Sequence, residues 1–260
     1  MKQSRLTTIV SAALLAGISS VAQADITVSK NDNYKLSIYG FAKLDATYQS
    51  DRTNSLVAPR FATAGNDSAT NLTAMDSRFG LKWKGPALEN GYQAGAVLEF
   101  DLFDSTSSNQ MEVRGRLAAF TLSRDASSWL VGQHWDVFSP LNPTTLMTNG
   151  NLWNTGNLGF RRAQVRYSRK GDVLDWAVSV NDPSTSGTAP NTDAPIIEGR
   201  VELELGRSKI GISGAFGDDE TTIPGEEKDI EGISVDWLIR LDDNLIFKGE
   251  PPTAKIWRSS

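Results

Sequence analysis

The sequence comprises 260 residues with a net charge of -5 at pH 7 and no cysteine. The acidic balance argues against a nucleic-acid binder, and the lack of cysteine excludes a disulfide framework and a thiolate metal site. After the N-terminal segment, no stretch approaches the roughly 18 consecutive apolar residues of a membrane-spanning helix. The mean hydropathy of -0.31 is compatible with strands that are apolar on one face only.

The first 24 residues (1–24) have the pattern of a secretory signal peptide. Lys2 and Arg5 are positively charged, the run that follows is apolar and small, and Ala22-Gln23-Ala24 is typical of a signal-peptidase site. The apolar run is too short, and too often interrupted by Thr and Ser, to be a membrane anchor. We therefore expect export with removal of this segment, and a folded unit over residues 25–250.

The exported part alternates apolar and polar side chains over segments of barrel-strand length. About eleven such segments are predicted, at residues 36–48, 75–84, 92–102, 112–121, 128–133, 162–168, 174–181, 197–205, 210–216, 233–239 and 244–250. Successive side chains of a strand point to opposite faces of its sheet, so each segment has one apolar and one polar face. The apolar faces are predicted to include Leu44, Phe79, Leu98, Val113, Leu117, Ala119, Thr121, Val165 and Val201.

The connections between these segments alternate in length. Short turns are expected at 85–91, 125–127, 170–172 and 206–208, and long polar loops at 50–74, 104–110, 182–195 and 217–229. Aromatic residues also lie near many segment ends, which suits the interfacial girdles of outer-membrane barrels. These patterns predict an all-β fold, a transmembrane antiparallel β-barrel. A soluble secreted β-sandwich, such as an adhesin or a carbohydrate-binding protein, also alternates and is the alternative.

The segment 134–160 differs from the other loops because it carries several apolar anchors among Asn, Thr, Gly and Pro. A solvated loop has no need of these anchors, whereas a loop packed inside a barrel lumen does. We therefore predict a constriction loop, with a long external loop as the alternative. Its predicted members are His134, Trp135, Asp136, Asn149, Asn151 and Asn154.

Several stretches resemble known porins. The run 36–45, Leu-Ser-Ile-Tyr-Gly-Phe-Ala-Lys-Leu-Asp, is similar to a first porin strand. More specific are Ser77-Arg-Phe-Gly-Leu81, Arg114-Gly-Arg-Leu-Ala-Ala-Phe120, Gly132-Gln-His-Trp-Asp136 and the run 159–167, Gly-Phe-Arg-Arg-Ala-Gln-Val-Arg-Tyr. With these motifs the chain from about Leu36 to Glu250 resembles the DcaP-like outer-membrane porins.

This resemblance implies a homotrimeric, 16-stranded diffusion channel for small anionic solutes such as dicarboxylates, inserted into outer-membrane lipid by the assembly machinery. The sequence departs from the family at Pro251-Pro252, after which residues 251–260 show no strand alternation. Family members continue for several strands and usually end on an aromatic residue, whereas this chain ends on Ser260. We therefore interpret 251–260 as an aberrant non-strand tail, produced by a frameshift or an early stop, on an incomplete and non-functional barrel.

Charged side chains on the polar faces are the candidate pore lining. Arginine presents a planar fork that matches a carboxylate, and rings of Arg or Lys favour anion pores. Structural ion pairing with the neighbouring carboxylates is the alternative role for each of them. The predicted lining residues are Arg78, Lys82, Glu99, Asp101, Arg114, Arg116, Arg162 and Arg166, with Arg161 beside them at a strand edge.

Enzymatic chemistry has little support in the sequence. His134 is the single histidine, and no Gly-x-Ser-x-Gly motif accompanies it. One histidine with scattered carboxylates also makes a poor metal site. We expect no enzymatic activity, no cofactor and no bound metal, and a hydrolase that uses His134 is the remaining alternative.

Overall fold

The computed structural model describes residues 26–31, 33–56, 62–65, 67–104, 110–138, 140–141, 160–183, 194–220, 227–250 and 254–256; for 218–220, 227–230 and 254–256 only the backbone is described. The predicted signal peptide and Asn149, Asn151 and Asn154 lie outside these residues. Within them every regular element is a β-strand. In this part of the chain no helix has the length and apolarity needed to cross a membrane.

The strands run through the whole described chain. Their bounds are β1 Ile26–Lys30, β2 Lys35–Phe41, β3 Asp45–Gln49, β4 Ala69–Thr73, β5 Arg78–Ala87, β6 Gln93–Asp101, β7 Arg114–Arg124, β8 Ser127–Trp135, β9 Arg161–Arg169, β10 Leu174–Asn181, β11 Ile196–Leu205, β12 Ser208–Glu220, β13 Glu227–Arg240, β14 Ile246–Gly249 and β15 Ala254–Ile256. All the pairings between them are antiparallel, as predicted.

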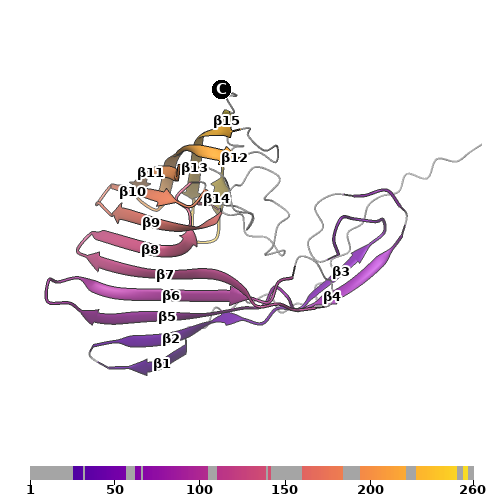
Figure 1. Ribbon diagram of the computed structural model, residues 1–260, viewed down its shortest axis with the longest axis horizontal. Helices are drawn as coiled ribbons and strands as arrows, with labels where there is room; N and C mark the ends of the chain where they lie inside the picture. The colour runs from indigo at the N-terminus through magenta and orange to yellow at the C-terminus, as the bar shows by residue number, and fades with distance from the viewer. Residues whose placement is uncertain are drawn as a thin grey trace, which may run out of the picture.

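Thirteen strands form one sheet in the order β1-β2-β5-β6-β7-β8-β9-β10-β11-β12-β13-β14, with β15 also paired to β13. In Figure 1 the strands β1, β2 and β5 to β9 are stacked in chain order, and the sheet then curls round through β10–β15. The separate hairpin of β3 and β4 projects beyond the ends of the other strands, between β2 and β5 in the sequence. No described strand pairs with the free edge of β1 or with that of β14 and β15, so the described sheet is open.

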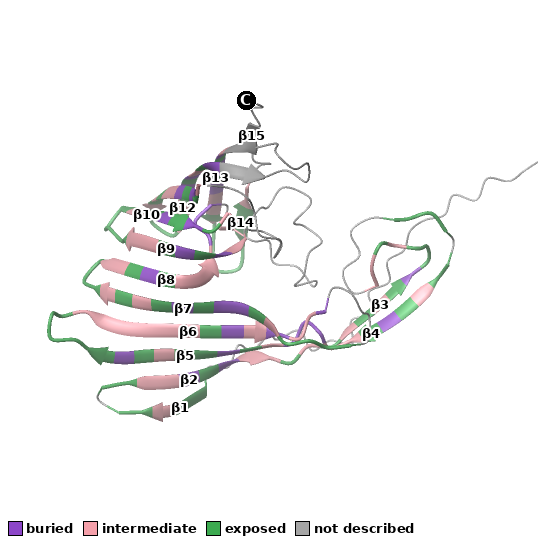
Figure 2. Cartoon of the chain, viewed as in Figure 1, coloured by how far each residue is buried: buried purple, intermediate pink, exposed green. Residues whose placement is uncertain are grey.

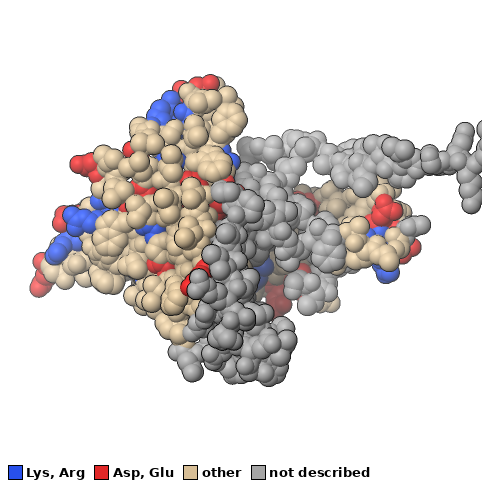
Figure 3. Space-filling view, turned by 90° about the horizontal axis from the view of Figure 1, so that it is seen from above, with Lys and Arg blue, Asp and Glu red and all other residues tan. Residues whose placement is uncertain are grey.

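The two faces of the sheet have opposite characters. The outer face exposes Leu98, Val165 and Val201, each 46 % exposed, while charged and polar side chains such as Asp101 and Glu198 are buried on the inner face. Along the strands in Figure 2 exposed and less exposed positions alternate, and in Figure 3 charged side chains gather mainly at the short-turn end. A soluble sandwich buries apolar residues between two sheets, so this inverted arrangement excludes the sandwich alternative.

A β-bulge in β7 overturns part of the predicted facing. Glu99 pairs with Leu117 and Phe100 with Gly115, so the pairing skips Arg116. After this extra residue the parity of β7 is reversed: Leu117 and Ala119 are buried on the inner face and Phe120 is 68 % exposed on the outer face. The prediction that Leu117, Ala119 and Thr121 face outward is therefore wrong.

The strand prediction was correct for the long segments and incomplete for the short ones. The predicted first segment is divided into β2 and β3 where the chain leaves the main sheet, and β1 and β4 were not predicted. The expected non-strand tail is wrong for residues 254–256, which form β15 and pair with Glu231–Ile233 of β13. Three residues are too few to produce a recognisable alternation.

Candidate functional site

Four arginines and two carboxylates gather near the long-loop ends of β5, β6, β7 and β9. Arg161 is the first residue of β9, and its guanidinium and that of Arg116 both lie near the Trp135 ring. The antiparallel register brings them together, because Arg78 and Arg114 both pair with Asp101. We call this group the arginine cluster; its members are Arg78, Glu99, Asp101, Arg114, Arg116 and Arg161.

Both carboxylates of the arginine cluster are held by arginines of β7. Arg114 grips Asp101 bidentately, with Nε–Oδ1 and Nη2–Oδ2 distances of 2.8 and 2.5 Å. Arg116 bridges the two acids, since its Nε lies 2.7 Å from Glu99 Oε1 and its Nη1 lies 2.7 Å from Asp101 Oδ2. Arg116 is the extra residue of the bulge, and both it and the following Leu117 are buried on the inner face. Tyr39 adds a hydrogen bond of 2.9 Å from its hydroxyl to Glu99 Oε2.

Two arginines of the cluster remain less well paired. Arg78 Nε lies 3.7 Å from Glu99 Oε1, beyond hydrogen-bond distance. Arg161 stacks near the Trp135 ring at 5.5 Å, and its buried Nη1 has no hydrogen-bond partner among the described residues. Four positive charges thus surround two negative ones. The six residues of the cluster therefore carry an excess of positive charge.

The other predicted lining residues lie apart from this cluster. Lys82 is exposed nearer the short turns, with its Nζ 4.2 Å from the centre of the Tyr39 ring. Arg166 Nη2 lies 3.3 Å from His134 Nδ1, and Arg162 Nη1 donates to the backbone oxygens of Asp182 and Pro183. The sequence reasoning did not separate these two groups, because strand parity gives the face of a residue and not its neighbours across the sheet.

The loop after β8 begins later than predicted. His134 and Trp135 are the last two residues of β8, and the loop starts at Asp136. The Asp136 amide donates to Phe160 O at 2.9 Å, and the Phe160 amide donates to Asp136 Oδ2 at 3.1 Å, so the two stems of the loop are joined at its base. Asp136 lies outside the strands. Its burial and the neighbouring negative charge of Glu198 raise the pKa of its carboxyl group above the usual range.

Glu198 of β11 is a site residue that the sequence reasoning did not single out. It is 3 % exposed, and its Oε2 accepts hydrogen bonds from the amides of Val137 and Phe138 at 3.0 and 3.4 Å. Alternation predicted its inward direction. Its partners lie 60 and 61 residues away in the sequence, however, and no local pattern indicates such a contact.

A second charged group lies on the inner face of β10–β13. Arg200 of β11 pairs with Glu202 at 2.8 Å and with Asp236 of β13, and Lys209 Nζ lies 2.8 Å from both Glu202 Oε1 and Glu204 Oε1. We call this the acidic cluster, because it contains two bases and four carboxylates, the fourth being Asp175.

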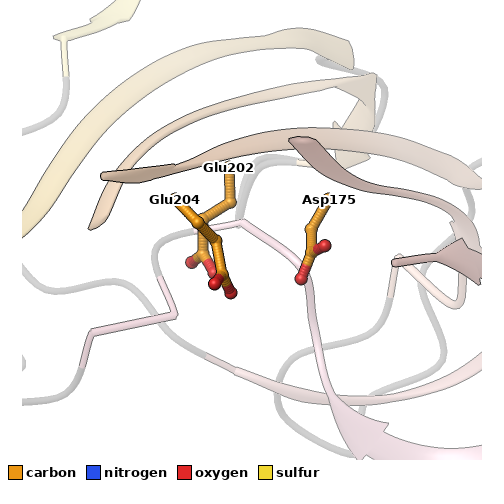
Figure 4. A group of neighbouring side chains, drawn as sticks. All are labelled: Asp175, Glu202 and Glu204. Atoms are coloured by element: carbon orange, nitrogen blue, oxygen red, sulfur yellow. The ribbon is translucent and has the colours of Figure 1, made fainter. Parts of the chain in front are cut away.

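Part of the acidic cluster is the closest approach to a metal-ligand set among the described residues. Oxygens of Asp175, Glu202 and Glu204 lie within 4.8 Å of one another, and Figure 4 shows the three side chains directed to the same side of the strands. Lys209 already places its ammonium group on two of these acids. The arrangement is therefore that of an ion-pair network.

The similarities of this chain to known proteins agree with the strand pattern described above. The sequence matches the family of Gram-negative porins over residues 11–237. The fold is similar to that of the outer-membrane channel DcaP of Acinetobacter baumannii, with a TM-score of 0.66 and 21 % identity. The match covers 84 % of this chain and 63 % of that one, so this chain spans less than two thirds of that channel. This likeness confirms the predicted β-barrel fold.

Two structures of OmpT, an outer-membrane protein of Vibrio cholerae, match less closely. A mutant lacking loop L8 has 14 % identity and a TM-score of 0.44, and the match covers 84 % of this chain and 81 % of that one. The in-vitro folded trimer form has 12 % identity and a TM-score of 0.45, with coverages of 84 % and 76 %. No curated protein matches the sequence.

Proposed function

Because the chain belongs to the Gram-negative porin family and is an outer-membrane protein, we propose that it supplies part of the wall of a water-filled diffusion channel. The solutes are small anions, dicarboxylates among them, and passage involves no covalent chemistry. The inverted distribution of side chains supports the channel, because an apolar outer face suits lipid and a charged inner face suits water.

The arginine cluster is the observation that carries the anion preference. Four arginines against two carboxylates leave excess positive charge, and such charge in a pore raises the local concentration of anions. Nη1 of Arg161, which has no hydrogen-bond partner in the described part of the chain, offers a donor to a passing carboxylate. A dicarboxylate has two acceptors and is the better match for a group with more than one excess charge.

The segment between β8 and β9 is proposed to narrow the pore as a constriction loop. Its described start supports this assignment, because Val137 and Phe138 are buried against the inner face. The proposal extends to Asn149, Asn151 and Asn154 as loop residues that meet the solute. It also includes removal of residues 1–24 as a signal peptide before insertion.

A working channel requires further strands, because unpaired backbone groups at an open sheet edge are not tolerated in lipid. The free edges of β1 and of β14 and β15 support the proposal that the described sheet is one part of a larger barrel wall. By itself this sheet is expected not to conduct. The completed barrel is proposed to assemble as a homotrimer with the help of the outer-membrane assembly machinery, as the resemblance to DcaP-like porins implies.

Reconstitution in planar bilayers tests the function. The channel purified from outer membranes should carry current, and its reversal potential in a salt gradient should indicate anion preference. Arg161→Glu should shift that potential toward cations, whereas Arg207→Glu, an exposed position in a short turn, should not. Cation selectivity of the unaltered channel would overturn the anion assignment. A purely structural or adhesive barrel would give no conductance at all.

A further inference from the structure

The first residues of the loop after β8 pack against β11, β12 and β13, which lie three to five strands further along the sheet from β8. Val137 is 4 % exposed and Phe138 is 7 % exposed, although the surrounding inner face is polar. An apolar pair in a water-filled lumen is buried only when the chain that carries it is held against the wall. The contacts that hold it come from β11, β12 and β13.

Glu198 supplies the central contact. Its Oε2 accepts two consecutive backbone amides, Val137 N at 3.0 Å and Phe138 N at 3.4 Å. These donors have left the β8 ladder, so without Glu198 they would be buried with no acceptor. A carboxylate that receives backbone N–H groups makes stronger hydrogen bonds than a neutral acceptor does. One strand residue thus holds the point where the loop departs.

Two further residues of the sheet, Ser213 and Gly232, adjoin residues 137–138. Ser213 of β12 donates its hydroxyl to Val137 O at 3.4 Å. Gly232 of β13 leaves space for the Phe138 ring, because a Cβ at this position would lie 3.0 Å from Phe138 Cζ. Gly232 pairs with Ala215, which in turn pairs with Glu198, so the carboxylate and the space for the ring lie in one row across the sheet.

We propose that Glu198 is the positioning residue of the loop between β8 and β9: with Ser213 and Gly232 it holds residues 137–138 against β11–β13 and so sets how far this loop narrows the lumen. The inference rests on the proposed function, because the position of the loop matters to solutes only in a pore. The positioning itself is a property of the folded wall and is measurable without any conduction.

Amide hydrogen exchange at Val137 and Phe138, in the protein folded in detergent, tests the positioning. Glu198→Ala should accelerate exchange at both amides by about tenfold or more, since two charge-assisted bonds are lost. Glu198→Gln keeps an acceptor oxygen and should restore most of the protection. If Glu198 acted only through its charge near Arg162, Gln would behave like Ala, and the proposal would be overturned.

Gly232→Val provides an independent route, because its new side chain displaces Phe138 without touching Glu198; it should accelerate the same two amides. Matched controls are Glu202→Ala, on the same strand and face but paired to Arg200 and Lys209, and Gly199→Ala, where an added Cβ meets nothing within 4 Å. Unchanged protection of both amides in Glu198→Ala and in Gly232→Val, with heat-modifiable gel mobility intact, would contradict the proposed positioning of residues 137–138.

Single-channel conductance then tests the narrowing separately. In the assembled channel Glu198→Ala and Gly232→Val should both raise conductance, and the two controls should not. Lost protection with unchanged conductance would overturn the narrowing role. A lack of conductance in the unaltered assembled channel would count against the proposed function, while the exchange data would still decide the positioning.

Discussion

The arginine cluster and the acidic cluster are built on the same curved sheet with opposite charge balances. The first has four arginines around two carboxylates, and the second has four carboxylates around two bases. They also differ in place, since the arginine cluster lies near the long-loop ends of β5–β9 and the acidic cluster lies on β10–β13. The wall therefore combines internal pairing, which stabilises it, with a local charge excess that we propose acts on passing solutes.

The two clusters should differ most in how strongly the free energy of unfolding depends on a single residue. Arg116 is 3 % exposed and is shared by Glu99 and Asp101, so Arg116→Met leaves both buried acids short of a partner. We expect the free energy of unfolding in detergent to fall by about 3–5 kcal/mol, measured by urea titration. The exposed pair of Arg207 and Asp243 is the control, and Arg207→Met should have little effect. A small loss at Arg116 would mean that Arg114 alone satisfies Asp101.

The contrast between the inner and outer faces can be tested beside the acidic cluster. Val201 follows Arg200 in β11 but points outward and is 46 % exposed. Val201→Arg places a charge in lipid and should cost about 2–4 kcal/mol, depending on its depth in the membrane. Urea unfolding in lipid vesicles measures the loss, and the same substitution at the solvent-exposed turn residue Asp242 is the control. Equal tolerance at both positions would mean that the outer face does not meet hydrocarbon.

Much of this facing could be predicted from the sequence, because alternation is a local property of a strand. The outward set of Leu44, Phe79, Leu98, Val165 and Val201 is exposed as predicted. The facing of Leu117 could not be predicted, because a bulge shows itself only in the pairing of β6 with β7. The facing of β7 after the bulge was therefore predicted wrongly because the bulge depends on strand pairing, which alternation along one strand does not show.

The site was predicted as a set of residues and not as an arrangement. Arg116 was expected to face inward, but its bridging of Glu99 and Asp101 depends on the bulge and on the register of three strands. Glu198 was missed as a site residue for a related reason. Its two donors are brought to it by the path of a loop that begins at the end of β8. Such long-range contacts leave no periodic signal in the sequence.

The acidic cluster should tolerate the loss of its central base better than the arginine cluster does. Arg200→Met removes the pairing of Asp236, but Glu202 keeps Lys209 at 2.8 Å. We expect a loss of about 2 kcal/mol by urea titration, below that of Arg116→Met, because only one buried acid is orphaned. A further substitution, Lys209→Met in the same background, should raise the cost. If Arg200→Met cost as much as Arg116→Met, the two clusters would not differ in redundancy.

The smallest expected effect concerns the loop base between the two clusters. Burial and the charge of Glu198 raise the pKa of Asp136, while Arg162 and Arg166 partly oppose this shift. An acid with a raised folded-state pKa contributes its full stability below its unfolded pKa and loses it as the pH rises through the folded pKa. Asp136→Asn stays neutral and keeps an oxygen for the Phe160 amide. Its advantage over the unaltered protein should therefore grow from mildly acidic to alkaline buffer, by about 1 kcal/mol.

Urea unfolding across this pH range, together with hydrogen exchange at the Phe160 amide, measures this advantage. Asp182→Asn serves as the control: Asp182 is exposed and takes part in this region through its backbone oxygen, which accepts from Arg162 at 3.1 Å. The control should follow the pH dependence of the unaltered protein. Parallel curves for Asp136→Asn and the unaltered protein would show that Asp136 stays ionised throughout. The negative charge of Asp136 would then balance the nearby Arg162 and Arg166, and the excess of positive charge on the inner face would not extend to the base of the loop.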